Sequence, residues 1–331
     1  MTPASDRRAA VLVALKAAAG AGVSGETLAA NLGVSRVAVA KHIAALRDAG
    51  YEIEAIRGSG YRLIAAPDLP LPDEVAPLLR LASSGSPRWR LFGGVETGST
   101  NDDAKRLARA GEPGGAVVLA SKQTAGRGRL GRTWASPPGG LYLSAVLRPP
   151  LPPAAVSPLA LAVGVGVARG LSRLGASPLL KWPNDVLLAQ DDGAAKVAGI
   201  LLEMSAETDV VEWVVAGCGL NVHRPPAGAL AGAGYLDDVL GDRPRLADVA
   251  AAVLDGIAEA YDAFLGDGFA ALAEEYRSRD ALRGREVAVR NATGAVLASG
   301  RVDGVDDQGR LLLHNGSERT AVAAGEVTLR P

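Results

Sequence analysis

The residues best suited to chemistry gather in one segment, residues 123–134 (QTAGRGRLGRTW), which we call the Gly–Arg loop. Three arginines, Arg127, Arg129 and Arg132, are interspersed there with glycines. Glycines let the backbone approach a ligand closely, and guanidinium groups bind carboxylate or phosphate in a bidentate manner. The pattern predicts a loop that binds an anionic, phosphate-bearing group. A flexible basic surface loop is the alternative interpretation.

The same loop contains the spacing G-x-G-x-x-G, at Gly126, Gly128 and Gly131. In a dinucleotide-binding fold a helix must follow these glycines directly. Residues 134–140 (WASPPGG) contain two prolines and two glycines and cannot form that helix. A nicotinamide dehydrogenase is therefore not expected.

Three further segments carry polar groups that suit a binding site. Residues 97–103 (TGSTNDD) offer uncharged hydroxyl and amide groups, although such a segment is also typical of a helix N-cap. Residues 181–185 (KWPND) form a polar turn with one cation and one carboxylate, and Lys196 precedes an apolar strand. The chain has only six lysines against 29 arginines, so these two indicate use as point charges, with exposed strand ends as the alternative.

Other classes of chemistry lack candidates. The chain has no G-x-x-x-x-G-K-[ST] loop, and His42, His223 and His314 lie too far apart in sequence for metal-ligand spacing. Cys218 sits in an apolar run, as a buried structural thiol would.

The longest apolar stretch, residues 159–168, is interrupted by glycines and is shorter than the ~20 residues that span a bilayer. With one cysteine and no apolar segment at the N-terminus, we expect a cytoplasmic protein without a membrane segment.

Residues 1–65 predict a DNA-binding module. Helical patterns over residues 7–19, 24–32 and 36–50 are followed by a short hairpin, which is typical of a winged helix-turn-helix. This segment carries eight Lys and Arg against five Asp and Glu, although the whole chain has a net charge of −1. The third helix would enter the major groove, with Arg57 and Arg62 on the wing near phosphates. The predicted DNA-binding residues are Ser35, Arg36, Lys41 and His42.

The rest of the chain predicts two more domains, which makes an α+β multidomain protein. A linker rich in proline, with the run SSGSP at 83–87, precedes a mixed α/β region. Apolar strands are expected at 116–120, 141–147, 196–204 and 211–218, and helices at about 101–110, 157–174, 246–265 and 268–279. From Arg283 onward, short strands separated by glycines predict a small β-barrel.

The segments GSTNDDA, SKQTAGRGRLGRTWASP, LYLSAVL, KWPNDVLL, KVAGILLEM and GCGLNVH occur in this order. Together they resemble bacterial biotin–protein ligases, and the leading module resembles the bifunctional subgroup that is also the biotin operon repressor. The resemblance implies a winged helix-turn-helix over residues 1–65, a linker over 66–88, a class II synthetase-like ligase domain over 89–280 and an SH3-like barrel over 281–331.

The resemblance also implies a reaction and its partners. Biotin and ATP with Mg²⁺ would give biotinyl-5′-adenylate and pyrophosphate, after which a lysine of a biotin carboxyl-carrier domain takes the biotinyl group. The adenylate would act as corepressor, promoting a homodimer that binds operator DNA. Alternative interpretations are a lipoate or octanoate protein ligase, a ligand-sensing transcription factor without ligase activity, and a purely structural N-terminal domain.

Site residues follow from the matching motifs. The resemblance implies catalytic roles for Lys196, Arg127 and Arg129. It implies biotin binding by Ser99, Thr100, Asn101, Gln123, Arg127, Gly128, Arg129 and Lys196. It implies binding of ATP or its phosphates by Arg129, Arg132, Lys181, Asn184, Asp185 and Asn221, with Asp185 also holding Mg²⁺.

The residue types agree with these roles. The ring system of biotin is uncharged and needs neutral partners, whereas attack of its carboxylate on the α-phosphate needs cations that offset repulsion between anions. Two positions depart from the family pattern. Leu130 replaces a basic residue of some relatives, and residues 224–245 match poorly, so that Tyr235 is only a candidate for stacking on adenine.

Overall fold

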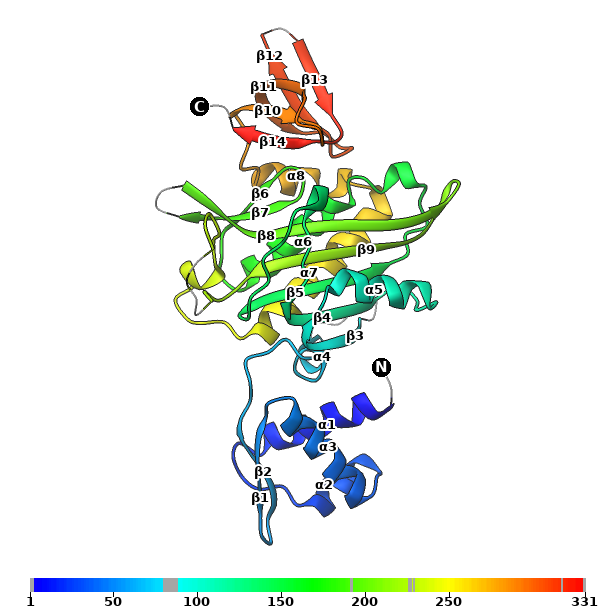
Figure 1. Cartoon of the computed structure of the whole chain (residues 1–331), viewed down its shortest axis with the longest axis vertical. Coiled ribbons are helices and arrows are strands. Elements are labelled where there is room, and N and C mark those ends of the chain that lie inside the picture. Colours follow the sequence, from blue (N-terminus) through cyan, green and yellow to red (C-terminus); the bar gives the residue numbers. More distant parts are fainter. Residues whose placement is uncertain are drawn as a thin grey trace.

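The computed structural model describes residues 3–79, 89–190, 193–225, 228, 230–316 and 318–329. Three bodies follow one another along the long axis of the molecule (Figure 1). A small helical body contains the N-terminus, a large sheet with helices forms the middle, and a small β body contains the C-terminal strands. The predicted run SSGSP at 83–87 lies outside the described residues.

The N-terminal body has the predicted winged helix-turn-helix. Its elements are α1 (Pro3–Ala17), α2 (Gly25–Leu32), α3 (Arg36–Asp48), β1 (Glu52–Ile56) and β2 (Gly60–Ala65). The side chains of Ser24 and Ser35 cap α2 and α3 by accepting the N–H groups of Thr27 and Ala38. Gly33 adopts a φ of 60° between the two helices, as a tight turn requires. The first helix ends at Ala17, so its predicted extension to residue 19 is wrong.

The predicted linker contains a helix that the sequence analysis missed. Helix α4 (Pro72–Leu79) packs between α1 and α7. Val75 is fully buried, and the carboxylates of Asp73 and Glu74 are also buried because they pair with arginine and lysine from the neighbouring bodies. Eight residues with an internal proline give a weak local signal, and these long-range partners stabilise the helix.

The middle body is built on a seven-stranded sheet with the order β3-β4-β5-β9-β8-β7-β6. All neighbouring pairs are antiparallel except β3 and β4. The strands are β3 (Arg90–Thr97), β4 (Ala116–Gln123), β5 (Gly140–Leu147), β6 (Pro178–Lys181), β7 (Asp185–Gln190), β8 (Gly193–Glu207) and β9 (Val210–Asn221). The four predicted strands match β4, β5, β8 and β9, whereas β3, β6 and β7 were not expected.

Helices cover both faces of this sheet. Val117 and Leu119 of β4 face the large core formed with α6 (Leu159–Arg173) and α7 (Leu246–Asp267), while their neighbours Ala116 and Val118 face α5 (Thr100–Arg109). Helices α6 and α7 approach closely through glycines: a Cβ at Gly166 would lie 2.6 Å from the Cα of Ile257. The segment Pro153–Arg173 is long and apolar enough to cross a membrane, but it is mostly buried inside the protein, as a core helix is.

The C-terminal body is β-rich, as predicted. Strands β10 (Glu286–Arg290), β11 (Val296–Val305), β12 (Leu311–Asn315), β13 (Glu318–Val322) and β14 (Glu326–Leu329) pair in the order β13-β12-β11-β10-β14. Helix α8 (Ala270–Ser278) connects α7 to this body. The indole N–H of Trp182 donates to the carbonyl of Gly309 at 3.1 Å, which ties the β body to the turn between β6 and β7.

Candidate functional site

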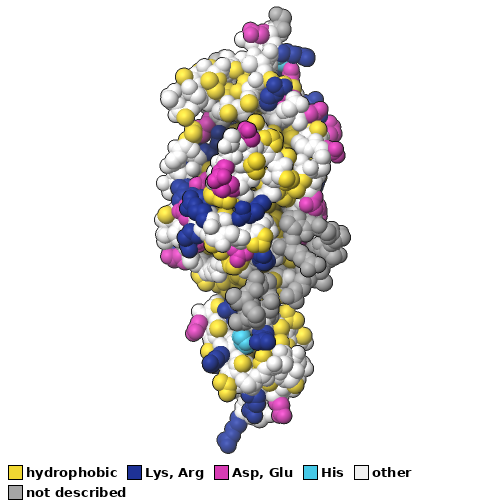
Figure 2. All heavy atoms as spheres, turned by 90° about the vertical axis from the view of Figure 1, so that its right-hand side faces the viewer, with side chains coloured by type: hydrophobic (Ala, Val, Ile, Leu, Met, Phe, Trp, Pro, Cys, Tyr) yellow, Lys and Arg dark blue, Asp and Glu magenta, His cyan; other side chains and the backbone are white. Residues whose placement is uncertain are grey.

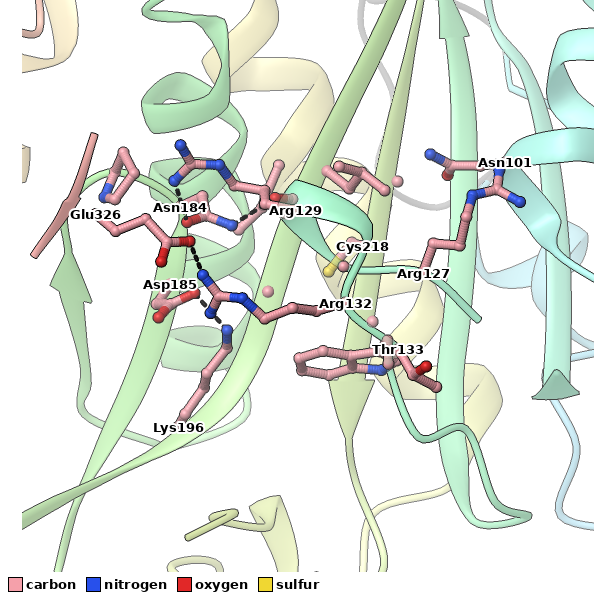
Figure 3. A pocket seen from close by; sticks show the side chains of 18 of the residues that line it. Asn101, Arg127, Arg129, Arg132, Thr133, Asn184, Asp185, Lys196, Cys218 and Glu326 are labelled. Atoms are coloured by element: carbon pink, nitrogen blue, oxygen red, sulfur yellow. Dashed lines mark hydrogen bonds and ion pairs between the residues drawn. The ribbon is translucent and has the colours of Figure 1, made fainter. Parts of the chain in front are cut away.

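A cavity of about 300 Å³ lies beside the central strands of the large sheet. Its walls come from the start of α5, the end of β4, the Gly–Arg loop, the turn before β7, the strands β8 and β9, and β14 of the C-terminal body. Figure 3 shows side chains from these segments converging on it. Twelve predicted site residues line the cavity: Ser99, Thr100, Asn101, Gln123, Arg127, Gly128, Arg129, Arg132, Lys181, Asn184, Asp185 and Lys196.

The Gly–Arg loop folds back on itself above the cavity. The N–H of Gly128 donates to the carbonyl of Arg132 at 2.7 Å, and the N–H of Trp134 donates to that of Gly126 at 3.0 Å. A Cβ at Gly126 would lie 2.5 Å from the carbonyl oxygen of Trp134, so only glycine fits there. Leu130 has a φ of 54° and a half-exposed side chain at the tip. The loop is a defined hairpin, not an extended surface segment.

One end of the cavity presents uncharged polar groups. The N–H and hydroxyl of Thr100 donate to Oε1 of Gln123 at 2.9 and 3.1 Å, and Nε2 of Gln123 donates to the hydroxyl of Ser136. The hydroxyl of Ser144, which is fully buried, lies 2.8 Å from the Thr100 hydroxyl and 2.6 Å from Oδ1 of Asn101. This end can offer donors and acceptors to a neutral polar ring without introducing charge.

Glycines make the sheet flat beneath this end, a feature that the sequence analysis missed. A Cβ at Gly217 would lie 2.1 Å from Oδ1 of Asn101, and one at Gly219 would lie 2.4 Å from the indole nitrogen of Trp134. Asn101 and Trp134 therefore lie directly on the strand β9. The indole N–H of Trp134 is buried and has no hydrogen-bond partner among the described residues. The alternating glycines of GCGLN are the sequence signal that could have predicted this surface.

Charged groups meet at the other end. Nζ of Lys196 lies 2.5 Å from Oδ1 of Asp185 and 5.1 Å from the centre of the Trp134 ring. The guanidinium of Arg129 donates to Oδ1 of Asn184 at 3.1 Å and to the carbonyl of Gly325 at 3.2 Å. Burial lowers the pKa of Arg129 from its ordinary value, and this exceeds the opposing effect of the Asp185 carboxylate.

The C-terminal body completes the charged end. Glu326 of β14 forms an ion pair with Arg132, as Figure 3 shows. No sequence signal linked Glu326 to a loop nearly two hundred residues away. Apart from Arg127, four cations line the cavity together with two carboxylates: Arg129, Arg132, Lys181 and Lys196 with Asp185 and Glu326. This positive excess suits a ligand with several phosphates.

Arg127 has a different environment from the other loop arginines. Its guanidinium donates to both carboxylate oxygens of Asp102, at 2.6 and 2.7 Å. This bidentate contact holds the pKa of Asp102 well below its usual range. In Figure 3, Arg127 lies beside Asn101, on the opposite side of the cavity from Lys196 and Asp185.

Asn221 and Tyr235 lie outside the lining of the cavity. The amide of Asn221 donates to the carbonyl of Gly234 at 3.3 Å, and the hydroxyl of Tyr235 accepts the N–H of Leu230 at 2.8 Å. The N–H of Gly234 donates to the carbonyl of Lys196, so this segment runs alongside the start of β8. Both side chains are buried next to the charged end of the site.

The predicted DNA-binding residues lie on and before α3. Arg36 and Lys41 are exposed, His42 is half-buried, and the Ser35 hydroxyl caps the helix. Burial lowers the pKa of His42, and nearby arginines lower it further. Figure 2 shows Lys and Arg side chains on the surface of this body. The exposed basic residues in the first half of α3 are suited to contact the phosphates and base edges of DNA.

Comparisons with known proteins agree with this arrangement. Residues 94–221 match the biotin/lipoate A/B protein ligase family, residues 7–62 match an HTH domain, and residues 283–330 match the biotin protein ligase C terminal domain. The bifunctional ligase/repressor BirA of Bacillus subtilis is 34% identical over 93% of this chain and 94% of its own length. The protein of the same name from Escherichia coli is 34% identical over 93% and 92%.

Solved structures of similar proteins include the biotin protein ligase from Aquifex aeolicus in complex with biotin and ATP. It is 29% identical, with a TM-score of 0.59, and the alignment covers 73% of this chain and 98% of that one. A biotin–[acetyl-CoA-carboxylase] ligase of Paracoccus denitrificans is 38% identical over 70% of this chain and 98% of its own length.

Proposed function

This chain belongs to the biotin protein ligase family of bifunctional ligase/repressors, and from that premise we propose how its residues perform both activities. The protein is an ATP-dependent biotin–protein ligase with a helix-turn-helix repressor domain. The observation that carries the mechanism is the division of the cavity into an uncharged end and a cationic end. Biotin has the same division, with a neutral ring system and an anionic carboxylate.

Biotin binds with its rings at the uncharged end. Ser99, Thr100, Asn101 and Gln123 supply neutral donors and acceptors, and Gly128 of the loop covers the rings. The glycines of β8 and β9 let Asn101 and Trp134 lie directly on these strands, where both side chains can pack beside the rings. The carboxylate then points toward Lys196 and Arg129.

The first step joins two anions. The biotin carboxylate attacks the α-phosphate of ATP, a new C–O–P linkage forms, and pyrophosphate leaves with the electrons of the broken P–O bond. Lys196 and Arg129 offset the charge that develops on the phosphoryl oxygens, while Lys181, Asn184 and Arg132 hold the departing phosphates. We assign Asn221 and Tyr235 to the nucleoside end of ATP, because the segment that holds them runs alongside Lys196.

Mg²⁺ fits this site only as a companion of ATP. No group of three or more His, Cys, Asp or Glu side chains that would hold an ion exists among the described residues. Mg²⁺ commonly binds through one or two carboxylates together with substrate phosphates. Asp185 would supply the carboxylate. When bound there, the ion would neutralise part of the charge of the phosphates.

The second step transfers the biotinyl group to a protein. A lysine amine of a biotin carboxyl-carrier domain attacks the acyl carbon of the adenylate, AMP leaves, and an amide bond forms.

For repression, we propose that the adenylate-bound protein forms a homodimer on two operator half-sites, because one small module contacts too few base pairs for useful specificity. Both partners, carrier domain and DNA, would be met inside the cytoplasm.

Pyrophosphate release tests the substrate assignment. Biotin with ATP and Mg²⁺ is expected to release pyrophosphate, whereas lipoate and octanoate are expected to release little. A faster reaction with lipoate or octanoate would favour the related acyl-protein ligases. No reaction with any of the three acids would favour a transcription factor without ligase activity.

A further inference from the structure

Four charged side chains lie together beside the uncharged end of the cavity: Asp102, Lys105, Arg127 and Glu203. We call them the charged quartet. They come from three segments, since Asp102 and Lys105 belong to α5, Arg127 to the Gly–Arg loop and Glu203 to β8. Asp102 and Glu203 fall within the family segments GSTNDDA and KVAGILLEM, but of the four residues only Arg127 was given a role at the site.

Each carboxylate of the quartet is shared by both cations. Arg127 donates to both oxygens of Asp102, at 2.6 and 2.7 Å, and lies 3.5 Å from Glu203. Nζ of Lys105 lies 2.9 Å from Asp102 and 2.7 Å from Glu203. Two positive and two negative charges cancel, so the quartet adds little net charge to the site.

The guanidinium of Arg127 is therefore committed to carboxylates. Its two terminal nitrogens, Nη1 and Nη2, are already in bidentate contact with Asp102, a geometry that guanidinium groups otherwise use for phosphate or substrate carboxylate. Figure 3 shows it directed away from Arg132, Lys196 and Asp185 at the charged end. Arg127 instead ties the first half of the Gly–Arg loop to α5 and β8.

Glu203 has a second contact that reaches the uncharged end. Its Oε2 accepts a hydrogen bond from Nδ2 of Asn101 at 2.8 Å. A carboxylate can only accept, so the amide nitrogen of Asn101 must face Glu203 and the amide oxygen must face Ser144. Asn101 is 6% exposed and cannot turn freely. Glu203 thus fixes the orientation of a predicted biotin-binding amide.

We propose that Asp102 and Glu203 are positioning residues of the ligase: through Arg127 and Asn101 they hold the Gly–Arg loop closed over bound biotin and its adenylate. This inference rests on the proposed function, since it concerns the same cavity. Isolated ion pairs at the surface contribute little to the stability of a structure, but a bidentate pair within a network of four charges contributes more. Loss of one carboxylate would leave the reacting groups at the charged end in place and loosen the loop.

The test compares Asp102→Asn and Glu203→Gln with the control Asp103→Asn. Asp103 is the next residue of α5, but it pairs with Thr97 and Arg106 and does not line the cavity. Three quantities are measured: kcat and KM for biotin in pyrophosphate release, and the dissociation rate of preformed adenylate. In both quartet variants we expect KM and the dissociation rate to rise roughly fivefold or more, with kcat within about threefold of wild type.

Two further variants separate positioning from loss of folding. Asp102→Glu retains a carboxylate and is expected to recover most of the biotin affinity. If Asp102→Asn does not fold, Arg127→Lys keeps the charge but loses the bidentate contact, and it should show the same rise in KM and dissociation rate. Trypsin cleavage within the loop of the adenylate-bound protein should also be faster in each weakened variant.

The outcomes distinguish this inference from the proposed function. If the wild type and Asp103→Asn release pyrophosphate with biotin while both quartet variants match them in KM and adenylate dissociation, the quartet does not position the loop. A fall in kcat with unchanged KM would also overturn the inference, because it would place the quartet in the chemical step. No biotin-dependent release by the wild type would instead contradict the proposed function.

Discussion

Arg245 and Glu74 join the catalytic body to the DNA-binding body. The guanidinium of Arg245, at the start of α7, lies 2.7 Å from the buried carboxylate of Glu74 in α4. The same carboxylate accepts hydrogen bonds from Lys16 of α1 and, at 2.6 Å, from the hydroxyl of Tyr51. One carboxylate of α4, a helix that lies between the two bodies in Figure 1, therefore contacts both of them.

This junction is expected to carry part of the coupling between ligand and DNA. If adenylate tightens operator binding, operator DNA must tighten adenylate binding by the same factor. In Arg245→Gln we expect pyrophosphate release to stay within about twofold, while the ligand-induced gain in operator affinity falls roughly threefold or more. DNA titrations at fixed salt, with biotin, ATP, both or neither, measure that gain.

The control for this prediction is Arg173→Gln, which removes an exposed ion pair between α6 and α7 with Glu259 and does not touch Glu74. It should leave the coupling unchanged. An unchanged coupling in Arg245→Gln as well would show that the junction does not transmit the signal. An operator affinity indifferent to every ligand combination would remove the repressor function altogether.

A second contact between segments predicts a pH-dependent stability. His223 is buried between Asp68, before α4, and Asp237, at 2.9 and 2.8 Å. Burial alone would lower the pKa of His223, but the two carboxylates outweigh it and raise the pKa above its ordinary value of about 6.5. The resulting stabilisation is fully present below about pH 6.5 and is lost as the pH rises through the raised pKa.

The variant His223→Gln should therefore lower Tm more at about pH 6 than at about pH 9. Thermal unfolding of both proteins across this range measures the difference. His314→Gln, which removes a partly exposed contact with Asp303 in the C-terminal body, is the control for a histidine–aspartate pair elsewhere. A Tm difference that is equal at both pH values, or larger at high pH, would contradict the account.

Asp280 predicts a stabilising substitution. Its Oδ1 accepts the N–H of Leu282 at 2.9 Å, but Oδ2 is buried with no hydrogen-bond partner among the described residues. Burial raises the pKa of Asp280 to about 6. For a raised carboxyl pKa, stability falls as the pH rises from about 4 to about 6 and stays lower above that range.

Asparagine keeps the acceptor for Leu282 and cannot ionise. At pH 7, Asp280→Asn is expected to increase the free energy of unfolding by roughly 1–3 kcal/mol, and the gain should vanish near pH 4. Denaturant titrations at the two pH values measure it. The exposed Asp307, substituted by asparagine, provides the control and should give no gain. A destabilised Asp280→Asn at pH 7 would show that the carboxylate is needed in its charged form.

Lys196 is expected to be essential for adenylate formation. A charge-assisted hydrogen bond contributes about 1.5–3 kcal/mol, so Lys196→Ala should slow pyrophosphate release by about tenfold or more. The control is Lys122→Ala, which removes an exposed ion pair with Glu96. Release within a factor of about two of wild type would place Lys196 outside the reaction.

The sequence was informative where a motif itself forms the site. The Gly–Arg loop, the KWPND turn and Lys196 were predicted from residue type and spacing, and all three line one cavity. The strands β4, β5, β8 and β9 were predicted because each is a continuous apolar run. Asn221 and Tyr235 stay predictions, since neither lines the cavity in this structure.

The missing parts depend on long-range contacts. Glu326 reaches the site only because β14 folds back onto the Gly–Arg loop, and Glu203 only because β8 lies against the start of α5. The sequence predicts a linker where α4 forms, because the partners of its buried acids lie far away in sequence, in α1 and at the start of α7. Strand β6 is four residues long, too short for a clear pattern.

The most direct test of the central claim is the intact mass of a biotin carboxyl-carrier domain after incubation with this protein. With biotin, ATP and Mg²⁺ together, the carrier should gain a single biotinyl group, and omission of any of the three should abolish the gain. A carrier that stays unmodified under the complete conditions would contradict the ligase assignment. So would a carrier that is modified more readily with lipoate or octanoate than with biotin.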